Sequence, residues 1–161
     1  MIQLCDSVVS KPLAMIFNKC LLTGVFPSDW KKSNVVPIHK KGDKQDIKNY
    51  RPISLLPICG KIFERIIYNS IYSFMENNNL FCTNQSGFRS SDSCINQLIS
   101  ITHLCYQAFD CNPSLEARAV FLDISKAFDK VWHDGLVFKL ECIGIEGQLL
   151  KLLDSFLKNR Y

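Results

Sequence analysis

The chain has 161 residues, of which 47% are hydrophobic and 21% charged, with a formal net charge of +4. This balance is typical of one folded domain with a core and excludes a disordered chain. No run approaches the roughly 18 consecutive apolar residues of a membrane span, and the first residues lack the pattern of a secretion signal. The mild excess of positive charge permits a polyanionic partner without requiring one.

The eight cysteines include no C-x-x-C pair. We interpret them as mostly buried free thiols, which predicts a reducing, intracellular location in the cytoplasm or nucleus. His103 and Cys105 have no second pair at ligand spacing, so no zinc site is expected.

The first 50 residues predict a helix, a strand and a loop. Apolar residues recur at helical spacing before Gly24, which predicts a helix over 9–23. The β-branched segment 33–40 (SNVVPIHK) predicts a strand, and Pro37 favours an edge position. The polar residues 41–50 are expected to form a loop.

The middle of the chain predicts two long helices separated by a loop. Residues 51–57 lie between prolines and favour an extended segment. An amphipathic pattern then predicts a helix over 60–76. The Ser-, Asn- and Gly-rich residues 82–93 indicate a loop, with Ser91 or Asp92 capping a helix that ends near residue 109.

The last part of the chain begins with a turn at 112–114 and an apolar run at 117–124 (ARAVFLDI), which predicts a buried strand with a carboxylate at its tip. Short helices are expected over 126–131, 134–142 and 146–158. The order of elements predicts an α+β fold that is helix-rich with a small antiparallel sheet.

Asp123 follows that apolar run directly and is the most informative carboxylate. A buried carboxylate needs a partner, which a metal ion can supply at a strand end, but a cap or an ion pair would serve equally. Phe128 could form the floor of such a site, or it could pack with Trp132 as the core face of a helix. Asp129 is expected to pair with a basic residue.

A basic stretch occupies residues 31–51 and contains seven of the 19 Lys and Arg residues. These side chains are placed to meet phosphates, or they are simply the solvated face of a hairpin. Arg51, between Tyr50 and Pro52, is expected to be held in place, which suits either bidentate phosphate binding or an internal salt bridge.

The loop segment 85–89 (QSGFR) offers a third candidate site. Gly87 permits positive φ or a close backbone approach, and Phe88 and Arg89 have side chains that stack on nucleic acid. The alternative is an ordinary turn anchored by Phe88.

Four segments, in order, resemble the non-LTR (LINE-type) retrotransposon reverse transcriptases. Residues 35–57 and 84–98 resemble the two fingers blocks, and 119–133 (AVFLDISKAFDKVWH) resembles palm motif A with its D-x-x-x-A-F-D-x-V core. Residues 12–33 resemble the extension that precedes the fingers. The resemblance covers essentially the whole chain.

The resemblance implies a right-hand polymerase: an N-terminal extension at 1–34, fingers at 35–116 and an incomplete palm at 117–161. Such enzymes extend a DNA primer along an RNA template with dNTPs and two Mg²⁺ ions. It also implies a role for each matching residue. Asp123 and the carbonyl of Ile124 would bind metal, and Phe128 would exclude a 2′-hydroxyl. The implied triphosphate contacts are Lys40, Lys41 and Arg51, and the implied template contacts are Gln85, Gly87, Phe88 and Arg89.

The family's remaining metal carboxylates lie in a Tyr/Phe-x-Asp-Asp block, and this sequence contains no Asp-Asp dipeptide. One carboxylate is too few for two Mg²⁺ ions, so we expect the isolated chain not to polymerise. The alternatives are an RNA-binding remnant and a decayed copy without function. An incomplete palm would also expose apolar edges, which predicts self-association.

Overall fold

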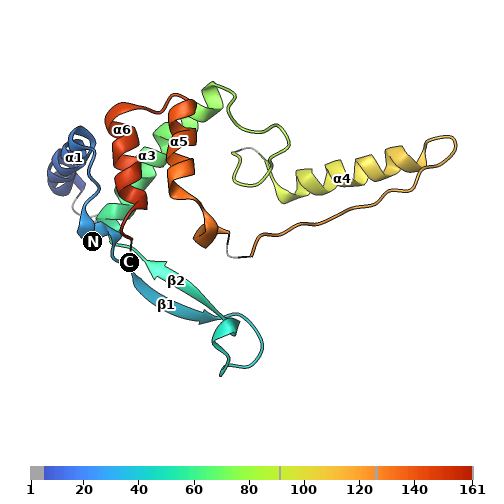
Figure 1. Ribbon diagram of the computed structural model, residues 1–161, viewed down its shortest axis with the longest axis horizontal. Coiled ribbons are helices and arrows are strands. Elements are labelled where there is room, and N and C mark those ends of the chain that lie inside the picture. The colour runs from blue at the N-terminus through green and yellow to red at the C-terminus, as the bar shows by residue number, and fades with distance from the viewer. Residues whose placement is uncertain (1–5, 91, 126, 161) are drawn as a thin grey trace. The chain divides into compact units, whose positions relative to one another are not determined.

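Helices dominate the computed structural model, which describes residues 6–90, 92–125 and 127–160 (Figure 1). The chain divides into two compact units, the first made of Met1–Phe74 with Val131–Tyr161 and the second of Met75–Lys130. Together with one small antiparallel sheet, the helices confirm the predicted α+β class.

The first unit contains most of the regular structure. Its elements, in chain order, are α1 (Asp6–Thr23), α2 (Ser28–Lys31), β1 (Asn34–His39), the 3-10 helix η2 (Ile47–Asn49), β2 (Tyr50–Leu55), α3 (Ile58–Asn77, whose last residues enter the second unit), α5 (His133–Cys142) and α6 (Gly147–Leu157). The predicted first helix, strand, extended segment and long amphipathic helix are therefore confirmed.

Strands β1 and β2 pair antiparallel, from Asn34 opposite Leu55 to His39 opposite Tyr50. Pro37 lies opposite Pro52 in this register. Proline has no N–H to donate, so such a pair is tolerated only where each strand has a free edge. The edge position predicted for Pro37 is confirmed.

An aromatic core joins the two ends of the first unit. The Phe63 side chain on α3 is fully buried, and its ring stacks on that of Phe17 from α1 with centroids 4.8 Å apart. Phe26 stacks on Phe63 at 5.9 Å and meets Phe156 of α6 edge-on at 5.0 Å. Trp30 contacts the edges of the same rings. Residues from both ends of the chain thus pack around one phenylalanine.

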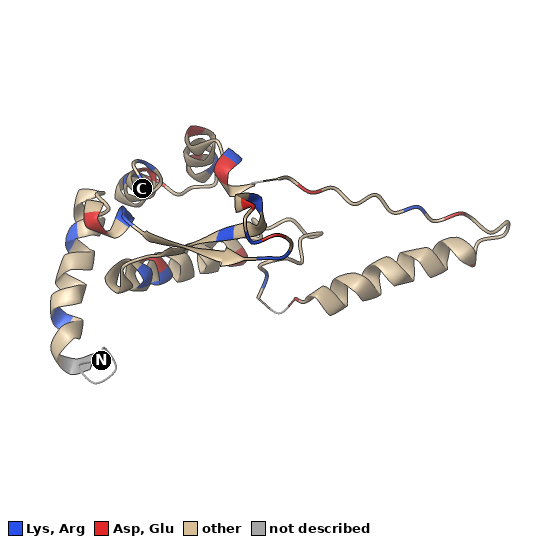
Figure 2. Ribbon diagram, turned by 90° about the horizontal axis from the view of Figure 1, so that it is seen from below, with Lys and Arg blue, Asp and Glu red and all other residues tan. Residues whose placement is uncertain are grey.

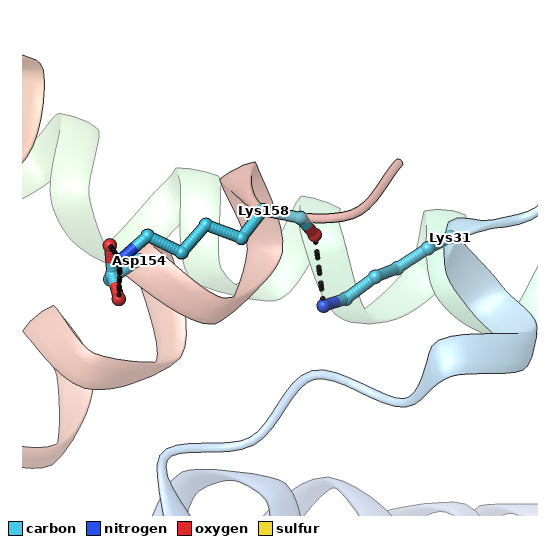
Figure 3. A network of polar contacts seen from close by, with 3 residues as sticks. All are labelled: Lys31, Asp154 and Lys158. Atoms are coloured by element: carbon cyan, nitrogen blue, oxygen red, sulfur yellow. Dashed lines mark hydrogen bonds and ion pairs between the residues drawn. The ribbon is translucent and has the colours of Figure 1, made fainter. Parts of the chain in front are cut away.

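Lys31 adds a buried polar contact to this core (Figure 3). Its Nζ donates to the backbone carbonyl of Lys158, 3.1 Å away at the C-terminal end of α6. Carbonyls at a helix C-terminus lack partners within the helix, so a cation there satisfies an acceptor and meets the negative end of the helix dipole. The side chain of Lys158 instead bonds to Asp154, which raises the pKa of Lys158.

The second unit has little regular structure. It holds α4 (Cys94–Phe109) and the 3-10 helix η3 (Phe128–Lys130), and none of its described residues is buried. The predicted helix to residue 109 is confirmed. The helix expected over 126–131 appears as the shorter η3, and residue 126 lies outside the described residues.

The strand predicted over 117–124 is wrong for this structure. The segment is extended but pairs with no strand among the described residues, and Leu122 is 93% exposed. A strand needs a neighbour to take its backbone hydrogen bonds, and β propensity alone does not supply one. The apolar run is therefore exposed where it was expected to be buried, and self-association through it stays a prediction.

Two smaller expectations are also corrected. Ser93, rather than Asp92, caps α4 by accepting from the backbone N–H of Asn96, while Ser91 lies outside the described residues. Of the described cysteines, which are all free, only Cys20 is buried, and this burial raises its thiol pKa. The described helices include none with the length and apolar character that a membrane crossing requires.

Replacing Lys31 by Met should lower the free energy of unfolding by about 1 to 2 kcal/mol, because the apolar stem stays while the charged hydrogen bond is lost. Urea unfolding measures this change. The matched control is Lys32→Met, because Lys32 pairs with Asp29 on the surface at 3.0 Å. That control should cost no more than about 0.5 kcal/mol, and equal losses in the two variants would contradict the capping role of Lys31.

Candidate functional site

The loop that joins β1 to β2 is held by its own backbone and amide groups. The Lys40 N–H donates to the carbonyl of Asn49 at 2.7 Å, and the Asn49 side chain donates to the carbonyl of Asp43 at 2.9 Å. Gly42 has φ +87° and a Cβ there would lie 2.9 Å from the Asn49 amide, so this turn requires glycine. The loop is thus a defined platform.

Both carboxylates of this loop are used within it. Asp43 accepts from the backbone N–H of Gln45, and Asp46 accepts from that of Lys48, both at 2.9 Å. No ion pair among the described residues involves the five cations of the hairpin, which are Lys40, Lys41, Lys44, Lys48 and Arg51. The hairpin therefore presents exposed positive charge that its own carboxylates do not pair with.

The guanidinium of Arg51 lacks the internal contact that the sequence analysis considered for it. Arg51 lies opposite Ile38 on the exposed strand β2, and its guanidinium takes part in no ion pair or side-chain hydrogen bond within the described chain. The internal salt bridge considered from the sequence is therefore not formed. With no charged partner among the described residues, the guanidinium remains available to an external anion.

Charge is distributed unevenly between the two units. The first contains 15 Lys and Arg against nine Asp and Glu, and the second four against six. Helix α4 carries no charged side chain at all, as Figure 2 shows. The net positive charge that would attract a polyanion therefore lies in the first unit.

The loop over 85–89 has its positive φ at Phe88 and not at Gly87, the residue for which the sequence permits it. The φ of Phe88 is +62°, in the left-handed region. The ring of Phe88 is 92% exposed, so it does not anchor the turn. A bulky residue held at positive φ stores about 1 to 3 kcal/mol of strain, which is typical of functional sites.

Other contacts hold this loop. The Gln85 amide donates to the Gly87 carbonyl at 3.0 Å, and the Ser86 hydroxyl donates to Gln97 of α4 at 2.6 Å. The Arg89 guanidinium lies over the Phe81 ring, 4.5 Å from its centroid. The anchoring residues Ser86 and Gln97 were missed from the sequence, because nothing in an 11-residue separation indicates the contact.

Asp92 completes the junction between this loop and α4. The Ser86 hydroxyl, the Ser93 backbone N–H at 2.7 Å and Asn96 hold the pKa of Asp92 below its usual value. These hydrogen bonds therefore favour the carboxylate form of Asp92. A hollow of about 430 Å³ opens beside it, lined partly by Gly87, Phe88 and Arg89.

The motif A residues Asp123, Ile124 and Phe128 are exposed to solvent. The described chain contains no group of three residues able to hold a metal ion. Phe128 begins η3 and is 88% exposed, so its alternative role as a core residue is not observed. The proposed positions of Asp123, Ile124 and Phe128 around a nucleotide stay predictions.

A family model described as "Reverse transcriptase (RNA-dependent DNA polymerase)" matches residues 38–161. Three curated proteins of Drosophila melanogaster are similar over 92% of the chain. They are the probable RNA-directed DNA polymerase from transposon BS (37% identical), the RNA-directed DNA polymerase from mobile element jockey (38%) and the probable RNA-directed DNA polymerase from transposon X-element (36%). The chain spans 16% of the length of each of these relatives.

Replacing Phe88 by Gly should leave the protection of the 82–93 loop amides against hydrogen exchange unchanged. Relief of backbone strain offsets the added freedom of the unfolded chain. Amide hydrogen exchange across the loop measures this. Phe81→Ala is the control and should speed exchange, because Arg89 loses the ring beneath it. If Phe88→Gly speeds exchange as much as Phe81→Ala, then Phe88 anchors the turn after all.

Proposed function

Because this chain belongs to the reverse transcriptase family, we propose that it provides the fingers and the beginning of the palm of a non-LTR retrotransposon RNA-directed DNA polymerase. In that role it binds a primed RNA template and an incoming dNTP. The observation that carries the proposal is the β1–β2 hairpin, whose five cations have no ion-pair partner among the described residues.

The hairpin suits the triphosphate. Lys40 follows β1 directly, and Arg51 lies on β2 opposite Ile38, so both come from one hydrogen-bonded frame. A planar guanidinium binds phosphate oxygens in pairs, and an ammonium acts as a point charge. We assign Arg51 with Lys40 or Lys41 to the incoming triphosphate, and the remaining hairpin lysines to the RNA backbone.

The 85–89 loop suits a template base. Phe88 is exposed and strained, and Gly87 has no atom within 4 Å of where a Cβ would lie, so the loop surface is open. Exposed aromatic rings stack on bases without regard to sequence. Gln85 and Arg89 would hold the loop around such a base, through the amide bond to Gly87 and the contact on Phe81.

The metal requirement is met only in part by this chain. Asp123 and the carbonyl of Ile124 are oxygen donors of the kind that Mg²⁺ accepts, and when bound the ions would activate the primer 3′-hydroxyl. One carboxylate does not fit two Mg²⁺ ions, and the described residues include no group of three His, Cys, Asp or Glu side chains able to hold a metal ion. Phe128, at the start of η3, would select a deoxyribose sugar by its bulk.

RNA binding by the chain should weaken steeply with salt, because phosphate contacts release counterions. Replacing Lys41, Lys44 and Lys48 together by Gln should reduce the magnitude of the slope of log K against log salt by about 2, because these lysines remain for the RNA backbone when Lys40 joins Arg51 at the triphosphate. Fluorescence anisotropy with a labelled single-stranded RNA measures it. The control replaces the exposed Lys11, Lys19 and Lys139 by Gln. A flat response in the unmodified chain, or equal losses in the two triple variants, would refute the assignment.

The isolated chain should give no Mg²⁺-dependent primer extension on a primed RNA template, and Asp123→Asn should match it. The reason is the single carboxylate among the described ligands. A complete enzyme of the family, under the same conditions, is the positive control. Extension by the isolated chain that Asp123→Asn abolishes would show that the metal site is complete without further residues.

A further inference from the structure

Helix α3 carries a stripe of four side chains that the proposed function does not use. Lys61, Arg65, Tyr68 and Tyr72 recur at spacings of four, three and four residues, which places them on one face of the helix. The Arg65 guanidinium lies 5.4 Å from the Tyr68 ring centroid, and the Tyr68 and Tyr72 centroids are 5.6 Å apart with the rings tilted by 35°. The stripe is about 16 Å long.

The two cations of the stripe are available. Lys61 and Arg65 are exposed and form no ion pair with any described residue. The nearest carboxylate along the helix, Glu64, is bound by Arg160 at 3.1 Å. Its charge is therefore already matched and does not cancel that of the stripe.

An apolar slot opens beside the aromatic half of the stripe. It has a volume of about 270 Å³ and lies between α3 and α6, with Tyr68 and Ile71 on one side and Leu153 and Phe156 on the other. Drug-sized ligand pockets begin near 300 Å³, so this slot is the size for a single ring system. Tyr68 lines this slot and is half-exposed.

We propose that this stripe is a stacking track for single-stranded nucleic acid, separate from the hairpin and the 85–89 loop. Two cations followed by two aromatic rings on one helix face form a surface suited to an unpaired strand, since the cations can contact the phosphates and the rings can stack on the bases. A duplex keeps its bases stacked inside and offers no ring to Tyr68 or Tyr72. The occupant is a stretch of two or three unpaired nucleotides, and the proposal rests on the nucleic-acid binding proposed above.

The test compares a labelled oligouridine of about 12 nucleotides with an RNA duplex of the same length, by fluorescence anisotropy at fixed salt. Replacing Tyr68 and Tyr72 by Ala should weaken oligouridine binding at least tenfold, because each stacked base contributes substantially. Replacing Tyr68 and Tyr72 by Phe should leave oligouridine binding as strong as in the unmodified chain, because the rings remain. Duplex binding should change less than twofold in either variant.

A second variant keeps the test independent of how well the alanine pair folds. Lys61→Gln with Arg65→Gln changes only exposed side chains and should lower the salt slope for oligouridine by about 1.4. The inference is overturned if this pair leaves the slope unchanged, if the phenylalanine pair binds as weakly as the alanine pair, or if duplex binding falls equally.

The hairpin triple variant, measured beside these, separates the two proposals. If only the hairpin variant loses oligouridine binding, the hairpin assignment stands and the α3 track is wrong. If only the α3 variants lose it, the track stands and the hairpin assignment is wrong.

Discussion

The packing of aromatic rings around Phe63 is the interaction on which the first unit depends. Phe17, Phe26 and Trp30 reach this ring from the N-terminal segment, and Phe156, from α6, contacts Phe26. Residues more than 120 positions apart in the chain are thereby brought together. Burying several aromatic side chains stabilises the unit by several kcal/mol before the ring geometry is counted, since each large apolar side chain contributes about 1.5 to 3 kcal/mol. The buried Lys31 then ties α2 to the end of α6.

The hairpin is connected at both ends to elements of this core. Strand β1 begins soon after α2, and β2 ends soon before α3, so both of its ends are attached to elements of the aromatic core. The loop between the strands is shaped by hydrogen bonds from Asn49, Asp43 and Asp46. The loop carboxylates accept hydrogen bonds from backbone N–H groups and do not form ion pairs with the lysines. The lysine side chains therefore remain available to bind a ligand. The five cations outnumber the two carboxylates, so the hairpin surface carries a net positive charge.

The second unit lacks a buried core of this kind among its described residues. It has no buried side chain among its described residues, and its loop is held by Ser86, Gln97 and the Arg89–Phe81 contact. Its apolar run at 117–124 and its uncharged helix α4 are exposed. Apolar side chains exposed on this scale usually mark a surface that meets another molecule or another part of the protein.

The long helices, the strand at 33–40 and the resemblance to the family follow from the sequence alone. The helical patterns before Gly24 and over 60–76 are local, and so are the two extended segments and the basic loop, because each depends on neighbours within a few residues. Motif A and the two fingers blocks were likewise recognisable from residue order alone. The candidate residues could be named from the sequence, but the arrangement around them could not.

Which strands, ions and polar groups pair with one another became clear only from the folded structure. The run at 117–124 reads as a buried strand, yet it is unpaired and exposed, because a strand forms only when another strand accepts its hydrogen bonds. Arg51 forms no ion pair with any residue that the structure describes, and the positive φ that the sequence permits at Gly87 is found at Phe88. The contacts of Ser86 with Gln97 and of Lys31 with Lys158 join residues far apart in sequence. No local pattern encodes such pairs, since they exist only once the chain has brought distant groups to bonding distance.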